Sequence, residues 1–226
     1  MINAINKIQK LTNTKSKTIE LNTSLPISLK VAEKIGYNRY ILNFANKSLN
    51  TRSAKQLNVG AEYWGEISSN SDNIIITGLY QKPSFDFMVL EDGLLLIERL
   101  VSEPDTAWLY EYLKQNLLAC SQKENFEIYA NMLLALQNNT INIGFKYSEN
   151  LGVFQYKKQK NYTKIYLVFS NFAPLLFELE ASDFKKITTP FKKVAKALNN
   201  SFECEIAVSD VKPLWVKNNS LIDFKG

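Results

Sequence analysis

Half-buried strands are indicated by residues 40–67, YILNFANKSLNTRSAKQLNVGAEYWGEI, because their apolar and polar residues alternate. Tyr40, Leu42 and Phe44 fall on one side of a predicted strand. Turns are predicted at residues 46–48 and at residues 57–60, where Gly60 suits a positive φ angle. With the flanking segments, residues 27–83 contain five short predicted strands joined by tight turns. This pattern favours a small OB- or SH3-like β-barrel.

Beyond residue 90 the apolar period changes from that of a strand to that of a helix. Helices are predicted over residues 93–101, from the N-cap Asp105 to about Leu117, and over residues 124–137. Four strands follow, and then a helix with Thr189 as its cap and Pro190 in its first turn. Residues 202–208 predict a further strand.

The predicted fold class is therefore α+β, with a small OB/SH3-like β-barrel, a helical middle segment and a C-terminal α+β sandwich. The predicted domains are residues 25–90 for the barrel, 91–139 for the helical segment and 140–226 for the C-terminal domain. Residues 1–24 are polar and predict a flexible segment with at most a short helix around Ile5, Ile8 and Leu11.

The composition is that of a globular chain, but it lacks residues and motifs that several classes of enzyme require. The chain has 226 residues, 46% of them apolar, a net charge of +5 and no histidine. The absence of histidine excludes the commonest general base and metal ligand. The sequence also lacks a Gly-rich phosphate loop, a dinucleotide fingerprint and a nucleophile elbow. We expect no catalytic residues, no metal and no cofactor.

The cysteines and the paired carboxylates also favour structural roles over metal binding. Cys120 and Cys204 match no metal spacing, and we expect two buried thiols in a reducing compartment. We interpret the pairs Glu178/Glu180 and Glu203/Glu205 as residues on the solvent-facing sides of half-buried strands. The sequence has no secretory signal pattern and no apolar run long enough to span a bilayer, so we expect a soluble, cytoplasmic protein without membrane insertion.

The net charge is concentrated towards the C-terminus. Residues 140–226 contain 13 Lys and 8 Asp or Glu, whereas residues 1–139 are balanced at 14 of each sign. Lysines alternate with tyrosines at a predicted hairpin end, and Trp215 follows Pro213 in the C-terminal segment as a candidate docking contact. The candidate binding residues are Tyr156, Lys157, Lys158, Lys160, Tyr162, Lys164 and Trp215.

Two groups of segments resemble the flagellar hook-length control proteins and their relatives. The first comprises YILNFANKSL (residues 40–49), LNVG (57–60) and YWGEI (63–67), and is similar to a small barrel module of that family. The second comprises KIYLVF (164–169), LLFEL (175–179), the helix 191–198 and the strand 202–208. Together their spans, residues 40–67 and 164–208, comprise 73 of the 226 residues. Phe172-Ala173-Pro174 stands where the family has Leu-Gly, and no long Pro/Gln-rich ruler region is present.

This resemblance implies a contact with a flagellar or type III export apparatus and a role in switching its substrates, but no ruler function. The leading hypothesis is thus a non-enzymatic protein-interaction module whose partner belongs to an export or motility apparatus. A nucleic-acid or nucleotide-signal binding protein, using the barrel or the basic hairpin, is the first alternative. An enzyme that works without histidine is the second.

Overall fold

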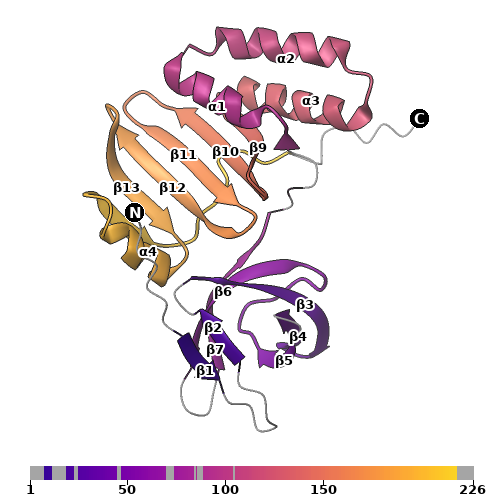
Figure 1. Cartoon of the computed structure of the whole chain (residues 1–226), viewed down its shortest axis with the longest axis vertical. Coiled ribbons are helices and arrows are strands. Elements are labelled where there is room, and N and C mark those ends of the chain that lie inside the picture. Colours follow the sequence, from indigo (N-terminus) through magenta and orange to yellow (C-terminus); the bar gives the residue numbers. More distant parts are fainter. Residues whose placement is uncertain are drawn as a thin grey trace. The chain divides into compact units, whose positions relative to one another are not determined.

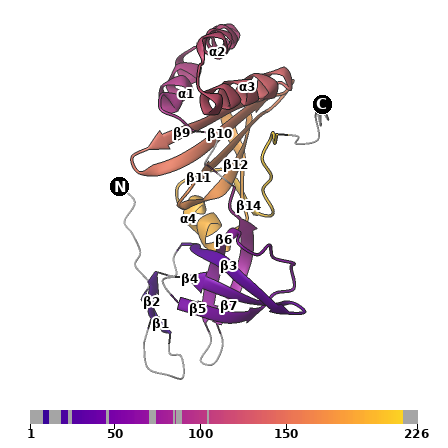
Figure 2. The same ribbon diagram turned by 90° about the vertical axis from the view of Figure 1, so that its right-hand side faces the viewer.

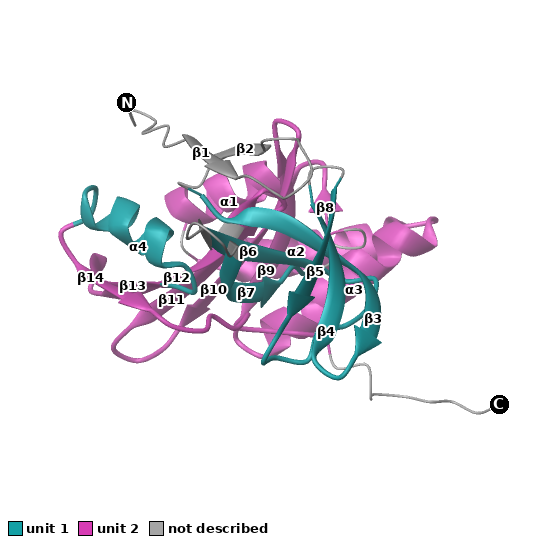
Figure 3. Cartoon of the chain, turned by 90° about the horizontal axis from the view of Figure 1, so that it is seen from below, with its two compact units in different colours: residues 1–83, 189–202 teal, residues 84–188, 203–226 magenta. Residues whose placement is uncertain are grey.

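The computed structural model describes residues 8–11, 19–22, 25–44, 47–69, 74–83, 85, 89–103 and 105–217. The chain forms two compact units (Figure 3). Unit 1 comprises residues 1–83 and 189–202, and unit 2 comprises residues 84–188 and 203–226. Both helices and sheets are present, so the predicted α+β class is confirmed.

Unit 1 is built on a curled antiparallel sheet with the strand order β5-β4-β3-β6-β7 (Figure 1). On β4, Tyr40, Leu42 and Phe44 are buried while Arg39 and Asn43 are exposed, as the alternation predicts. The strands are β3 (Ile27–Gly36), β4 (Arg39–Phe44), β5 (Lys47–Arg52), β6 (Glu62–Ser69) and β7 (Ile74–Gln81).

The predicted small OB/SH3-like β-barrel is not closed in the described residues of unit 1. Strands β5 and β7 end the sheet on opposite sides and do not pair with each other. The chain after β5 turns inward instead, and Leu57 from this connection joins the buried core with Leu29, Val31 and Ile67. An apolar side chain from a loop thus occupies space that a closing strand would otherwise cover.

Helix α4 (Lys192–Asn199) belongs to unit 1, although it follows the strands of unit 2 in the chain (Figure 3). Phe191, Val194 and Ala195 are buried and form the apolar stripe of the helix. The predicted start is wrong: Thr189 ends strand β13, and the helix N-cap is Phe191, without a capping side chain of its own. The carboxylate of Glu66 on β6 accepts a hydrogen bond from the Lys193 N–H at 2.6 Å and replaces that cap.

In its described residues, unit 2 combines three helices with a second sheet, in which β8 is parallel to β9 and the strands from β9 to β13 form an antiparallel meander. Its helices are α1 (Gly93–Ser102), α2 (Ala107–Ala119) and α3 (Lys123–Gln137). Its strands, in sheet order, are β14 (Glu205–Val208), β13 (Asp183–Thr189), β12 (Phe172–Glu180), β11 (Thr163–Phe169), β10 (Asn150–Lys158), β9 (Ile141–Tyr147) and β8 (Val89–Leu90).

The two faces of this sheet are covered by different parts of unit 2. Helices α1 and α3 contact β9 (Figure 1), and Ile141, Ile143 and Tyr156 pack with the helices in one apolar core. Because neighbouring residues of a strand point to opposite faces, Gln155 faces the other side. There its side chain binds the backbone of the C-terminal segment at residues 214 and 215, which runs along the sheet in Figure 2.

Two further sequence-based predictions are corrected. Residues 8–11 and 19–22 form the antiparallel strands β1 (Ile8–Leu11) and β2 (Ile19–Asn22) rather than part of a helix, since they pair with each other; the remainder of residues 1–24 lies outside the described residues. Cys120 follows α2 and Cys204 precedes β14, and both thiols are only half-buried.

None of the described helices has the length and apolar character required to span a bilayer.

Gly93, the first residue of α1, allows the helix to approach β9 closely. A Cβ atom at this position would lie 2.3 Å from the carbonyl oxygen of Gly144 and 3.0 Å from the Cα atom of Phe145. Gly93→Ala is therefore expected to lower the free energy of unfolding by about 1–3 kcal/mol. Urea unfolding measures this, with Gly36→Ala as the control, because the nearest described atom to a Cβ there is the Arg39 Cβ at 3.9 Å. Equal stability of the two variants would contradict this packing.

Candidate functional site

Strand β5 is an edge strand of the sheet in unit 1, and its hydrogen bonds to β4 show which of its backbone groups face outward. The Ser53 N–H donates to the Asn38 carbonyl oxygen at 2.9 Å, and the register continues from Arg52 opposite Arg39 to Lys47 opposite Phe44. In an antiparallel pair, alternate residues face the partner strand and the others turn their N–H and C=O groups away. Ser48, Asn50 and Arg52 therefore direct their backbone groups to the outer edge. No described strand pairs there.

The connection after β5 is held to the sheet by two buried tyrosines. The Leu57 N–H donates to the Tyr40 hydroxyl at 3.3 Å, and the Asn58 N–H donates to the Tyr63 hydroxyl at 3.0 Å. Gly60 has a φ angle of +85°, as predicted, and its N–H donates to the Val31 carbonyl oxygen at 2.8 Å. These contacts fix residues 53–60 beside the edge of β5.

A cleft of about 610 Å³ lies between β5, this connection and β7, and we call it the seam cleft. Leucine and isoleucine side chains contribute its apolar part, and Arg52 and Lys55 contribute two positive charges. Its volume is within the range of ligand sites. The lining residues are Leu42, Asn50, Thr51, Arg52, Ser53, Ala54, Lys55, Leu57, Ile75, Ile76, Gly78 and Leu79.

A second cleft, of about 660 Å³, lies in unit 2 and contains three of the predicted binding residues, Tyr156, Lys157 and Lys158. They occupy the end of β10, opposite the first turn of α2. The structure thus combines the basic hairpin with Tyr110, whose side chain is exposed. The full lining is Asp105, Thr106, Ala107, Tyr110, Leu136, Asn139, Ile141, Tyr156, Lys157, Lys158 and Gln159.

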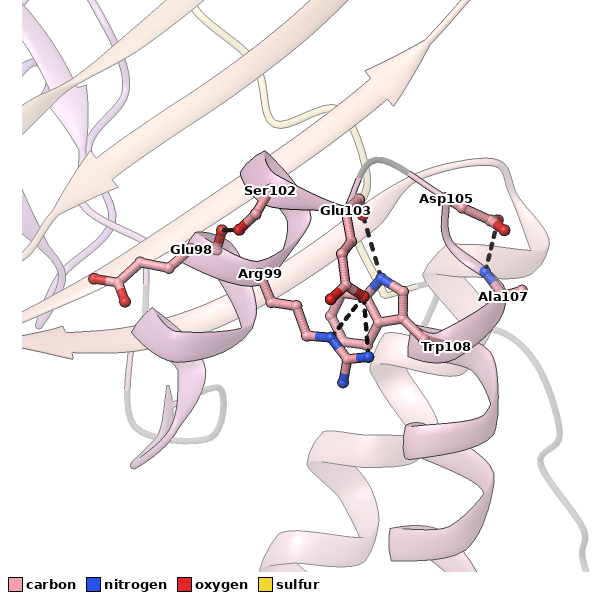
Figure 4. A network of polar contacts seen from close by, with 7 residues as sticks. All are labelled: Glu98, Arg99, Ser102, Glu103, Asp105, Ala107 and Trp108. Carbon is pink, nitrogen blue, oxygen red and sulfur yellow. Dashed lines mark hydrogen bonds and ion pairs between the residues drawn. The ribbon is translucent and has the colours of Figure 1, made fainter.

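The α1–α2 junction beside this second cleft is held by a polar network (Figure 4). The Arg99 guanidinium lies 4.2 Å from the centre of the Trp108 ring and forms an ion pair with Glu103 at 3.0 Å. The Trp108 indole N–H donates to the Glu103 carbonyl oxygen at 3.3 Å, and the Ala107 N–H donates to the Asp105 carboxylate at 3.1 Å. Arg99 is therefore occupied by structural contacts.

The remaining predicted binding residues lie outside the lining of both clefts. Lys160 is exposed in the β10–β11 turn, and Tyr162 is exposed next to Lys164, whose Nζ atom lies 5.4 Å from the tyrosine ring centre. Lys164 also forms an ion pair with Glu178 at 3.1 Å. Trp215 is half-buried, and both its N–H and its C=O bind the side chain of Gln155.

The carboxylates singled out on the sheet of unit 2 neutralise lysines on neighbouring strands. Lys157, Lys164, Glu178 and Lys186 stand opposite one another in register across β10 to β13. Lys186 in turn pairs with Glu205 at 2.6 Å, and this contact raises the pKa of the Lys186 ammonium. The row alternates in sign over most of its length, which is favourable for directly opposed side chains.

One titratable group in the described part of the chain has a strongly shifted pKa. Partial burial and a hydrogen bond to Asp92, with an O–O distance of 2.5 Å, raise the pKa of the Tyr112 hydroxyl. Its ring also meets Tyr129 edge-on. Tyr112 lines neither cleft. In the same described residues, no cluster of three or more carboxylate or thiol groups is arranged to hold a metal ion.

The sequence did not single out the outward-facing edge residues Ser48, Asn50 and Arg52. Residues 48–54 were predicted as a polar strand pairing back onto its predecessor, and β5 confirms that pairing. The available signal was the position of this strand as the second of a hairpin followed by an irregular connection, which is typical of an edge strand.

The comparisons with known proteins found no matching family model, no similar curated protein and no similar solved structure.

Proposed function

We propose that the protein is a non-enzymatic interaction module that binds an extended segment of a partner protein along the β5 edge, over the seam cleft. The observation that supports the proposal is the hydrogen-bonding pattern between β5 and β4, in which the backbone groups of Ser48, Asn50 and Arg52 face outward. An extended chain pairs with such an edge through main-chain hydrogen bonds, while pockets beside the edge select its side chains.

The lining of the seam cleft supports a partner segment of defined chemistry. Apolar groups such as Leu57 and Ile76 suit alternate apolar side chains of a strand, and Arg52 and Lys55 suit carboxylates. The preferred segment therefore alternates Asp or Glu with residues such as Val or Leu. The anchored connection at residues 53–60 presents the edge with little loss of conformational freedom on binding.

The resemblance of residues 40–67 and 164–208 to hook-length control proteins supports a partner in a flagellar or type III export apparatus. This finer proposal is tested by affinity capture with the full chain from the native cell, followed by mass spectrometry. Recovery of export or motility components by the wild type but not by an Asn50→Pro variant supports it. Recovery of the same components by both proteins, or of none by the wild type, contradicts it.

Asn50→Pro is the sharpest test of strand addition. Proline removes the outward N–H at residue 50 but leaves the residues that bond to β4 intact, and edge strands accept proline at such positions. We expect peptides selected from a random display library on the wild-type chain to be acidic and alternating. Asn50→Pro is expected to weaken their binding about tenfold, as measured by fluorescence anisotropy.

Asn50→Ala is the matched control, since it removes the same side chain but retains the N–H group. Its affinity is expected to remain within about twofold of the wild type. If Asn50→Ala and Asn50→Pro weaken binding equally, or if neither does, the segment does not pair with the β5 edge.

A further inference from the structure

The fold separates charge between the two units in a way that the linear sequence does not. Unit 1 contains 14 Lys and Arg against 5 Asp and Glu, a net charge of +9, whereas unit 2 contains 13 against 17, a net charge of −4. Helix α4 contributes three lysines to unit 1. Unit 1 therefore attracts polyanions, and such a field acts through the charges that remain unneutralised on its surface.

Two arginines form an unneutralised pair on the outer face of unit 1, and we call them the arginine pair. Arg39 on β4 and Arg52 on β5 are direct cross-strand partners, and both are exposed. Like charges in this position are destabilising. Neither forms an ion pair with a described residue, whereas Arg99, the remaining arginine of the chain, is stacked and paired.

The surroundings of the arginine pair are polar and cationic. Asn43 and Ser48, which share a hydrogen bond of 2.8 Å, lie further along the same outer face, as does Lys30 opposite Asn43. Glu33 is a carboxylate on this face, and its register partner is Ile41, not an arginine. A face with this many amide, hydroxyl and cationic groups does not suit insertion into a lipid surface.

The hairpin between β3 and β4 adds an exposed aromatic ring that is close in sequence to the arginine pair. Tyr37 stands in the turn two residues before Arg39 and is 90% exposed. The turn is fixed, because Asn38 adopts a φ angle of 55° and its carbonyl oxygen accepts the bond from Ser53. An exposed tyrosine ring beside cationic groups is the combination that stacks a base and holds its phosphate.

We propose that this face of unit 1 binds single-stranded nucleic acid, with phosphates held by Arg39 and Arg52 and a base stacked on Tyr37. Planar guanidinium groups match phosphate oxygens in a bidentate manner, and bound phosphates remove the repulsion within the arginine pair. Stacking on a single ring requires an unpaired base, which favours a single strand over a duplex.

The test measures binding of a fluorescein-labelled oligothymidylate to the full chain by fluorescence anisotropy at several salt concentrations. Arg39→Glu is the decisive variant, because Arg39 does not line the seam cleft. We expect it to weaken binding about tenfold or more and to reduce the salt dependence of the affinity. Tyr37→Ala is expected to weaken binding about tenfold with an unchanged salt dependence.

Lys146→Glu in unit 2 is the control, since it makes the same change of net charge at an exposed strand position. It is expected to change the affinity less than about twofold. Arg39→Glu itself is expected to fold, because a glutamate opposite Arg52 replaces repulsion by attraction, and its thermal unfolding temperature checks this.

Three outcomes overturn the proposal. The first is no binding of the oligonucleotide at low salt, and the second is an equal loss of affinity in Arg39→Glu and Lys146→Glu. The third is binding of polyglutamate, or of vesicles containing phosphatidylserine, as tight as that of the oligonucleotide, which would indicate an acidic protein or a lipid surface as the ligand.

Discussion

Gln155→Leu is expected to release the C-terminal segment of unit 2 from its sheet. The Gln155 side chain is 3% exposed and forms four hydrogen bonds: it donates to the Asn142 side chain and to the Trp215 carbonyl oxygen, and it accepts from the N–H groups of Leu214 and Trp215. Leucine has a similar volume but supplies none of these bonds. The free energy of unfolding is expected to fall by about 2–4 kcal/mol.

Amide exchange gives a local readout of this release. The N–H groups of Leu214 and Trp215 are expected to exchange slowly in the wild type and rapidly in Gln155→Leu. Gln159→Leu is the control, because it makes the same chemical change at an exposed side chain. Slow exchange at residues 214 and 215 in Gln155→Leu would show that other contacts hold the segment.

Glu66→Ala is expected to loosen helix α4 from the sheet of unit 1. The carboxylate is 5% exposed and binds the Lys193 N–H at the helix start, while the Lys193 ammonium donates to the Ile67 carbonyl oxygen at 2.8 Å. Alanine removes the cap and leaves a partly buried N–H without its acceptor. We expect a loss of about 2–4 kcal/mol, and a midpoint of thermal unfolding lower by about 5–10 °C.

Glu62→Ala on the same strand is the matched control. Glu62 is exposed and pairs with Lys82 at 3.3 Å, so its removal is expected to cost less than about 1 kcal/mol. Glu66→Gln keeps an oxygen acceptor and is expected to lie between the two. If Glu66→Ala and Glu62→Ala unfold at the same temperature, the cap contributes nothing measurable.

Local patterns in the sequence were sufficient to predict most of the elements. The alternation at Tyr40, Leu42 and Phe44 corresponds to β4, and the spacing of Phe191, Val194 and Ala195 corresponds to the buried face of α4. Both patterns arise from burial on one face of a single element, which neighbouring residues record directly. The class α+β follows from the same signals.

Long-range partners were not predictable in the same way. Glu66 and Lys193 are 127 residues apart, and Gln155 and Trp215 are 60 residues apart. A buried glutamate or glutamine on a strand resembles a solvent-facing residue until its partner is known. The cap of α4 was assigned to Thr189 for this reason, because a local hydroxyl is visible in the sequence and a carboxylate from another strand is not.

The candidate sites also combine local features, which the sequence shows, with long-range features, which it does not show. The basic hairpin was visible as a local run, and Tyr156, Lys157 and Lys158 do line a cleft. The opposite side of this cleft, formed by Thr106 and Tyr110, could be identified only from the fold. The β5 edge and the arginine pair depend on which strands end the sheet and on register, since a shift of one residue would turn Arg52 to the other face.

Pairing of a partner segment with the β5 edge is measured by residue-resolved amide exchange across residues 47–53, with and without a selected peptide. In the free protein, the N–H groups of Ser48, Asn50 and Arg52 are expected to exchange rapidly, while those of Leu49, Thr51 and Ser53 are protected by β4. Bound peptide is expected to protect the first set and leave the second unchanged. Unchanged rapid exchange at Ser48, Asn50 and Arg52 in the saturated complex would contradict strand addition at this edge.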